Sequence, residues 1–268
     1  MKIEQLYEKG SRKLNEDALL IQDTLFGVFD GASSMDGYAD KNGHTGAYVA
    51  ANIAKEIFKK NEGSLIELAK KANEQIRDEM AKAGIDVSKP INLWLTTAAA
   101  IRLNKDAFDW VQIGDSLILV INKDGSYKLL VDEYDHDIET LTMWKKLAEK
   151  KVNDIYKELH DQFVKVRNQV GILYGGLSGQ KEMNKFLNSG TERLKNVKHV
   201  ILFTDGLIVP KENPQEKDDF ETFTKLFLEG GLKKVRDHVR KLEEDDPNCW
   251  KHPRFKQYDD IAAIALSF

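Results

Sequence analysis

The sequence of 268 residues contains a single cysteine, Cys249, so an internal disulfide is excluded. No cluster of cysteine and histidine has the spacing of a zinc site. Long apolar runs are also lacking: the longest charge-free one, Ile91 to Ile101, is well short of the ~20 residues that span a bilayer. Met1 to Gly10 has no apolar core typical of a signal peptide. We therefore predict a cytoplasmic protein, in a reducing compartment and without membrane contact.

The sequence has no excess of basic residues. Lys and Arg number 40 against 44 Asp and Glu, which gives a net charge of -4 and a pI near 5.9. This balance argues against a nucleic-acid partner, because neutralising phosphates requires a basic face. The 41% hydrophobic and 9% aromatic content excludes a disordered chain. With scattered prolines and no repeat or linker, we expect one domain over residues 1–268.

Two blocks of the sequence predict antiparallel strands. Ala18 to Phe29 has two apolar runs separated by a short polar turn, which indicates a hairpin. Leu93 to Val131 contains two further turns, at Asn104 to Asp106 and at Asn122 to Gly125. The second turn includes Asp124-Gly125, a strong hairpin signal.

Helices are predicted between and after these blocks. One apolar stripe begins at Val49, and a second begins at Leu65 behind a capping box of Ser64 and Glu67. Further on, Thr140 to about Val166 predicts one long, exposed amphipathic helix.

The last part of the sequence predicts two strands and a helix. Val200 to Phe203 indicates a buried strand, and Ile261 to Phe268 indicates another. Between them, Asp218 to Glu244 predicts a helix interrupted at Gly230-Gly231.

Several carboxylates lie at the ends of the predicted strands. Asp30 follows Val28-Phe29, and Asp205 follows Leu202-Phe203. Any one Asp-Gly pair is more often a plain turn, but a carboxylate at the end of a buried strand needs a partner. No buried lysine or arginine is an obvious partner in the sequence. We therefore expect divalent cations, and oxygen ligands favour Mg²⁺ or Mn²⁺ over Zn²⁺.

Two such ions ~3.5–4 Å apart would suit hydrolysis at phosphorus. That chemistry also needs a cation directed at the phosphate. Arg12 is the arginine just upstream of the first acidic cluster, and its planar fork matches phosphate geometry. A solvated surface arginine is the alternative interpretation.

Taken in order, six short segments resemble the metal-dependent PP2C (PPM) protein phosphatases, of the bacterial type. They are Arg12 with Asn15-Glu16-Asp17-Ala18, Val28-Phe29-Asp30-Gly31, Thr96-Thr97-Ala98, Ile113-Gly114-Asp115-Ser116, Leu202-Phe203-Thr204-Asp205-Gly206-Leu207 and Asp259-Asp260-Ile261. The resemblance extends over almost the whole chain. It implies an α+β fold, a four-layer α-β-β-α sandwich of two antiparallel sheets flanked by helices, with a binuclear metal site at one end.

The resemblance also implies roles for individual residues. It makes Asp30 the carboxylate that bridges two ions, Gly31 a backbone carbonyl ligand, and Asp205 and Asp259 further carboxylate ligands. Glu16 and Asp17 resemble the acidic pair near the second ion, acting directly or through water. Asp115 resembles an aspartate that helps some bacterial members to hold a weaker third ion, and Arg12 lies where the family keeps its phosphate-binding arginine.

The sequence departs from the family pattern at three places. Ala32-Ser33-Ser34 follows Asp30-Gly31 where many eukaryotic members have a histidine, so no general acid is identifiable. Asp260 replaces a common asparagine and is expected either to tighten metal binding or to face solvent. The region around residues 133–197 is longer than expected and falls where the family varies and has a mobile flap. Its histidines, and the others of the chain, have no ligand spacing.

The leading functional hypothesis is hydrolysis of phosphoserine or phosphothreonine on proteins, by a hydroxide held between two Mn²⁺ or Mg²⁺ ions. The expected partners are then phosphorylated proteins. We expect the protein itself to be a monomer. A catalytically silent regulatory module and a hydrolase of a small phosphorylated metabolite are the alternatives.

Overall fold

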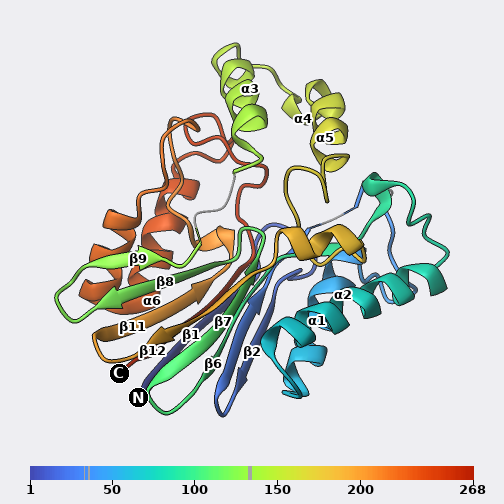
Figure 1. Ribbon diagram of the computed structural model, residues 1–268. Helices are drawn as coiled ribbons and strands as arrows, with labels where there is room; N and C mark the ends of the chain where they lie inside the picture. Colours follow the sequence, from blue (N-terminus) through green and yellow to red (C-terminus); the bar gives the residue numbers. More distant parts are fainter. Residues whose placement is uncertain (33, 36, 132–134) are drawn as a thin grey trace.

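Two five-stranded antiparallel sheets packed face to face form the centre of the computed structural model (Figure 1), which describes residues 1–32, 34–35, 37–131 and 135–268. In spatial order, the first sheet contains β1 (Lys2–Glu8), β12 (Ile261–Ser267), β11 (Val197–Phe203), β8 (Leu117–Asn122) and β9 (Tyr127–Leu129). The second contains β10 (Asn188–Arg193), β7 (Ala107–Ile113), β6 (Ala98–Leu103), β3 (Leu25–Phe29) and β2 (Ala18–Gln22). A short pair, β4 (Gly31–Ala32) and β5 (Leu95–Thr96), continues beside them.

Side-chain alternation along the strands divides the core into layers. In β8, Leu117, Leu119 and Ile121 pack into the cluster under the long C-terminal helix. Ile118 and Val120 pack into the cluster between the two sheets. Successive side chains of a strand point to opposite faces, so a run that is apolar throughout can be buried on both sides.

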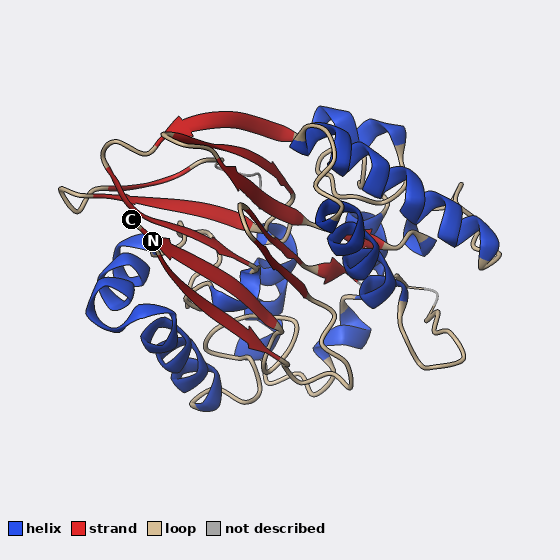
Figure 2. Ribbon diagram, turned by 90° about the horizontal axis from the view of Figure 1, so that it is seen from below, coloured by secondary structure: helices blue, strands red, loops and turns tan. Residues whose placement is uncertain are grey.

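Helices cover both outer faces of the sheet pair (Figure 2). α1 (Gly46–Lys59) and α2 (Leu65–Lys82) pack on the second sheet. α6 (Phe220–Glu244) packs on the first sheet and is kinked at Gly230 and Gly231, where the φ of Gly231 is 72°. The expected four-layer α-β-β-α sandwich is confirmed, and so is the expected interruption of the last helix.

Local signals of the sequence are confirmed at several other places. Ser64 and Glu67 form the expected capping box at the start of α2. The two expected turns join β6 to β7 and β8 to β9. Two strands were not expected: β1 and β10 expose much of their length and have mainly polar sequences, so they lack the apolar pattern that predicts a strand.

The prediction of one helix from Thr140 to Val166 is wrong. The segment forms α3 (Ile138–Glu149), α4 (Ile155–Glu158) and α5 (His160–Arg167). The break has a local cause, because Lys151 adopts a φ of 56° after α3 and the side chain of Asp154 caps α4. Part of the apolar pattern of the segment is buried, since Trp144, Ile155 and Leu159 share a cluster with Cys249.

These three helices stand at the end of the sandwich opposite to the two termini (Figure 1). They are attached to the loop that follows α6, where Trp144 Nε1 donates to the carbonyl of Cys249 at 2.9 Å. Three short 3₁₀ turns complete the chain: η1 (Pro90–Asn92), η2 (Lys181–Lys185) and η3 (Asp205–Leu207). Ser33 and Glu133, which the sequence analysis considered, lie outside the described residues. In the described ranges, no helix combines the length and apolar character needed to cross a bilayer.

Gly46→Ala gives a test of the packing of α1. Alanine normally stabilises a helix relative to glycine. Here a Cβ on Gly46 would lie 2.1 Å from Cδ1 of the buried Trp94 ring, so the ring or the helix must shift. We expect a loss of about 1–3 kcal/mol in unfolding free energy, the usual cost of overpacking, measured by urea denaturation. The exposed Glu56→Ala in the same helix should change it by less than about 0.5 kcal/mol. A Gly46→Ala protein as stable as the wild type would refute this packing.

Candidate active site

Five aspartates from separate segments meet at one end of the sandwich. Asp17 precedes β2, Asp30 ends β3, Asp115 lies in the turn from β7 to β8, Asp205 begins η3, and Asp259 precedes β12. Each of them acts electrostatically on others of the group, and Asp205 is affected by Asp30, Asp259 and Asp115. The convergence that the sequence resemblance implied is therefore present in the structure.

Burial and mutual repulsion raise the pKa values of Asp17, Asp30, Asp115 and Asp205. Burial, followed by the charge of Asp115, raises the pKa of Asp30 to about 7. Burial, followed by the charge of Asp30, raises the pKa values of Asp17 and Asp205 well above their usual range. Burial also raises the pKa of Asp115, and the nearby His136 opposes this change. Such a group can be fully ionised at neutral pH only if positive charge is supplied.

The backbone near Asp30 is fixed by close packing. The carbonyl of Asp30 accepts a hydrogen bond from the N–H of Thr97 at 2.9 Å. A Cβ on Gly31 would lie 2.6 Å from the backbone oxygens of both Ala47 and Glu16. Glycine is therefore required at position 31 by the close approach of two other segments.

The turn that positions Asp115 is also tightly specified. Gly114 has a φ of 71°, and a Cβ there would lie 2.6 Å from Cγ2 of Thr97. Thr97 Oγ1 and Ser116 Oγ are 2.6 Å apart, which ties this turn to β6. Asp115 Oδ1 is buried and finds no hydrogen-bond partner among the described residues. A buried oxygen of this kind is suited to a cation.

Glu16 and Asp17 are held by different partners. The Glu16 carboxylate accepts from Arg12 Nη1 at 2.7 Å through one oxygen and from Thr45 Oγ1 at 2.5 Å through the other. Asp17 Oδ2 accepts from Thr204 Oγ1 at 2.7 Å. The Arg12 side chain is 43% exposed while Glu16 is buried, so the guanidinium lies at the rim of the site.

Asp260 holds the backbone next to the site through hydrogen bonds. It is buried, and its two oxygens accept from the backbone N–H groups of Gly10 at 2.7 Å and Glu16 at 2.8 Å. Of the two expectations for Asp260, the one in which its side chain faces solvent is wrong. Its carboxylate fixes the segment that presents Arg12 and Glu16, because a buried N–H without an acceptor would be costly.

A lysine lies among the carboxylates. Lys256 Nζ is 2.5 Å from Asp259 Oδ1, and its charge also acts on Asp30 and Asp205. The assumption that no basic side chain would partner this group is therefore wrong. Local sequence patterns do not indicate this contact, because Lys256 belongs to an irregular loop with no apolar pattern that would indicate burial.

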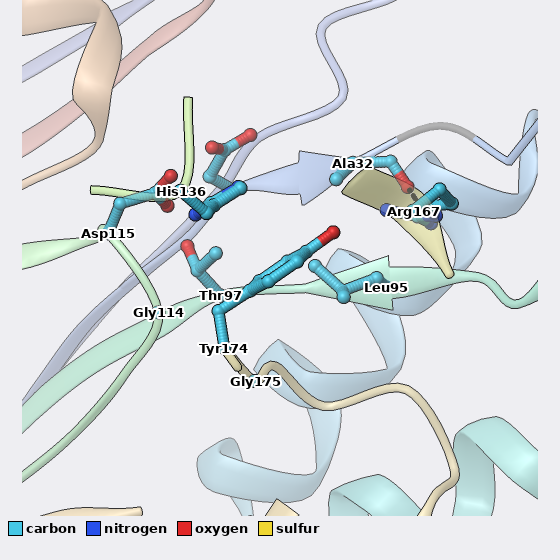
Figure 3. A pocket seen from close by; sticks show the side chains of 10 residues that line it. Ala32, Leu95, Thr97, Gly114, Asp115, His136, Arg167, Tyr174 and Gly175 are labelled. Atoms are coloured by element: carbon cyan, nitrogen blue, oxygen red, sulfur yellow. Dashed lines mark hydrogen bonds between the residues drawn. The ribbon is translucent and has the colours of Figure 1, made fainter. Parts of the chain in front are cut away.

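A small cavity adjoins Asp30 and Asp115 (Figure 3). It measures about 70 Å³. The ring of His136 stacks on Tyr174 with centroids 3.8 Å apart, and the buried Arg167 donates to the carbonyl of Leu93 at 2.7 Å. The remaining lining residues are Ala32, Leu95, Thr97, Gly114 and Gly175. Sequence reasoning missed His136, Arg167 and Tyr174, because no local spacing relates them to carboxylates so far away in the chain.

The family model for protein phosphatase 2C matches residues 10–244 of this sequence. A comparison with curated protein sequences finds no significant match. Among solved structures, the serine/threonine phosphatase PstP/Ppp of Mycobacterium tuberculosis is similar with a TM-score of 0.61 at 17% identity, covering 100% of this chain and 98% of that one. Stp1 of Staphylococcus aureus, a serine/threonine phosphatase, gives 0.57 at 17% identity, covering 100% and 94%.

A third similar structure is the catalytic domain of PstP in complex with two manganese ions, with a TM-score of 0.58 at 15% identity, covering 98% of this chain and 96% of that one. At these identities the solved structures establish the fold. The family match covers most of the chain, so this protein belongs to the protein phosphatase 2C family. The match ends before Asp259 and Asp260, which the tertiary structure places beside the other acidic residues.

The raised pKa of Asp30 predicts how pH affects the metal-free protein. In the unfolded chain its carboxyl ionises near pH 4, whereas in the folded protein it ionises at about 7. Between these values the unfolded state binds fewer protons, so the stability present at low pH is lost as pH rises through about 7. Asp30→Asn removes the ionisable carboxyl and with it this pH-dependent loss of stability. We expect its advantage in melting temperature over the wild type, measured in EDTA, to be larger at pH 8 than at pH 5.

Asp109→Asn is the matched control. Hydrogen bonds from Thr191 and Asn104 lower the pKa of Asp109, so the same change there should bring no gain that grows with pH. An advantage of Asp30→Asn that stays constant between pH 5 and pH 8 would contradict the raised pKa.

Proposed function

We propose that this protein hydrolyses phosphoserine and phosphothreonine on proteins, using two divalent cations, Mn²⁺ or Mg²⁺, held by the aspartate group. The convergence of Asp30, Asp115, Asp205 and Asp259 from four separate segments supports this proposal. Membership of the protein phosphatase 2C family gives the reaction class. An all-oxygen donor set is the one that Mg²⁺ and Mn²⁺ prefer.

The side chains fit such ions in chemistry. The buried Asp115 Oδ1 lacks a hydrogen-bond partner in the described part of the chain, and the raised pKa values show a shortage of positive charge. Within the described ranges, no three His, Cys, Asp or Glu side chains are already arranged to hold one ion. Lys256 is the basic member of the aspartate group.

Specific residues would hold the ions. Asp30, Asp205 and Asp259 would hold one ion, Asp30 would also contribute to the second, and the Gly31 carbonyl is proposed as a backbone ligand. Glu16 and Asp17 are proposed near the second, directly or through water, and Asp115 would hold a weaker third ion. When bound, the ions would neutralise phosphoryl oxygens and activate the nucleophile. The PstP catalytic domain, which has the same fold, is in complex with two manganese ions.

Arg12 is proposed to bind and orient the substrate phosphate. Its ion pair with Glu16 fixes the guanidinium at the rim of the site, where it is 43% exposed. A guanidinium presents several N–H donors in a plane that matches phosphate. The charge of Arg12 also acts on Tyr156 of α4, so the arginine lies on the side of the site that faces the α3–α5 region.

The size of the cavity favours a protein substrate over a small metabolite. At about 70 Å³, it is much smaller than the ~300–1,000 Å³ pockets that enclose small molecules. A phosphorylated side chain could enter while the rest of a protein substrate stays outside. The parts of the site made by Tyr174, His136 and Arg167 come from the α3–α5 region and its flanks, which would then contact the protein that carries the phosphate.

The first test is hydrolysis of phosphoserine and phosphothreonine peptides by protein stripped with EDTA and reloaded with Mn²⁺ or Mg²⁺. Activity should disappear with EDTA and return with either ion. Asp30→Asn, Asp205→Asn and Asp259→Asn should each lower kcat by orders of magnitude at saturating Mn²⁺, because each removes a charged ligand.

Two outcomes would contradict the proposal. Folded, metal-loaded protein that hydrolyses neither phosphopeptides nor p-nitrophenyl phosphate would identify a silent binding module. Hydrolysis of small phosphate esters without phosphopeptides would identify a metabolite hydrolase. Asp109→Asn, in the half of β7 (Ala107–Ile113) that lies away from Asp115, is the control and should keep wild-type turnover.

Arg12→Ala tests the phosphate contact. Loss of a charged hydrogen bond of ~1.5–3 kcal/mol should raise both the KM for phosphopeptide and the inhibition constant of phosphate by roughly 10- to 150-fold. Arg12→Lys should recover only part of the phosphate binding lost in Arg12→Ala, because the lysine ammonium lacks the planar fork of a guanidinium. Metal affinity should stay nearly constant, and the exposed Arg193→Ala should change neither constant. Changes below about twofold in Arg12→Ala would identify a merely solvated arginine.

A further inference from the structure

We infer that Lys256 is a tethered cation of the metal site: its ammonium group pairs with the aspartates in the metal-free protein and must move away for divalent ions to bind. This inference rests on the proposed function, since it concerns the same site. It goes further by assigning a role to a residue for which neither the sequence nor the proposed mechanism has a use.

The geometry places the ammonium within the aspartate group. Lys256 Nζ lies 2.5 Å from Asp259 Oδ1, which also accepts from the backbone N–H of Asp260 at 2.7 Å. The Lys256 side chain is only 20% exposed. Its charge acts on Asp30 and Asp205 as well as on Asp259. One positive charge is therefore shared by three of the carboxylates proposed to bind metal.

Hydrogen bonds organise the loop that carries Lys256 and hold its backbone near the site. Asp246 accepts from the backbone N–H groups of Trp250 and His252, at 2.9 Å each, and from Arg254 Nη1 at 2.8 Å. Arg254 in turn donates to the carbonyl of Gln257 at 3.1 Å, directly beyond Lys256. The backbone at position 256 is thus fixed on both sides, and only the flexible side chain can move the charge.

The Lys256 ammonium and a divalent ion would compete for Asp259, because both are positively charged and both would pair with its carboxylate. Asp259 Oδ1, one of the two oxygens with which Asp259 could bind an ion, now pairs with the ammonium, and a +2 ion beside a +1 group would be repelled. Lysine is suited to such a role because its ammonium is a compact point charge at the end of a flexible four-carbon side chain. Without metal, the same ammonium relieves part of the repulsion among the aspartates. Lys256 therefore stabilises the metal-free protein and weakens the binding of metal.

The test compares Lys256→Met with wild type and two controls. Lys251→Met removes the same charge from the same loop, but Lys251 is 61% exposed and pairs with Glu212. Lys256→Arg keeps the charge at the site. After EDTA stripping, Mn²⁺ binding is measured by calorimetry. Lys256→Met should bind Mn²⁺ at least tenfold more tightly than wild type, a difference of about 1.4 kcal/mol. Lys251→Met should differ by less than twofold, and Lys256→Arg should bind no more tightly than wild type.

Thermal unfolding supplies a second measurement that is independent of activity. In EDTA, Lys256→Met should melt at a lower temperature than wild type, because removing the lysine from a partly buried ion pair leaves the aspartates without that positive charge. With saturating Mn²⁺ this deficit should disappear. A lysine that only braces the loop would instead give the same deficit with and without Mn²⁺.

Three results would overturn the inference. Equal Mn²⁺ affinity in wild type and Lys256→Met would show that the ammonium does not compete, and would leave the proposed function intact. Weaker binding in Lys256→Met would show that the lysine assists metal binding, and would also leave it intact. Absence of Mn²⁺ binding in both folded proteins would overturn the proposed function and the inference together.

Discussion

Repulsion between aspartates at one end of the β-sandwich is the constraint on which the rest of this structure depends. Five carboxylates act on each other there, and burial raises the pKa of Asp30 to about 7. Only a rigid scaffold can hold like charges in this arrangement. The two sheets provide it, because their inner faces form one continuous apolar cluster and each aspartate lies at a strand end or in a tight turn.

The irregular part of the chain supplies the positive charges and the surroundings of the site. Lys256 lies in the loop after α6, which is organised by Asp246 and is attached to α3 through Trp144. The segments that flank α3–α5 also provide His136, just before α3, and Tyr174, after α5, beside Asp115 (Figure 3). Direct contacts therefore link the aspartates to Lys256, and link the loop of Lys256 to the proposed protein-binding side, although these parts are distant in the sequence.

Sequence reasoning succeeded where the signal is local. The capping box at Ser64, the hairpin turns and the break at Gly230 depend on residues within a few positions of each other. It failed where distant contacts decide. The single helix expected from Thr140 was wrong, because a left-handed turn at Lys151 divides an apolar pattern that packs against the loop near Cys249. The polar edge strand Lys2–Glu8 forms by pairing with β12, which its own pattern does not indicate.

By itself, the sequence determined the alternation of buried strands, the helices that cover them, and the acidic residues at strand ends. These follow from side-chain period and turn chemistry, which act over a few residues. Only the tertiary structure decided what surrounds those acids. It buried Asp260 under two backbone N–H groups, placed Lys256 against Asp259, and put His136 beside Asp115. Burial and charge proximity depend on chain segments that meet only in the fold, so local patterns contain no record of them.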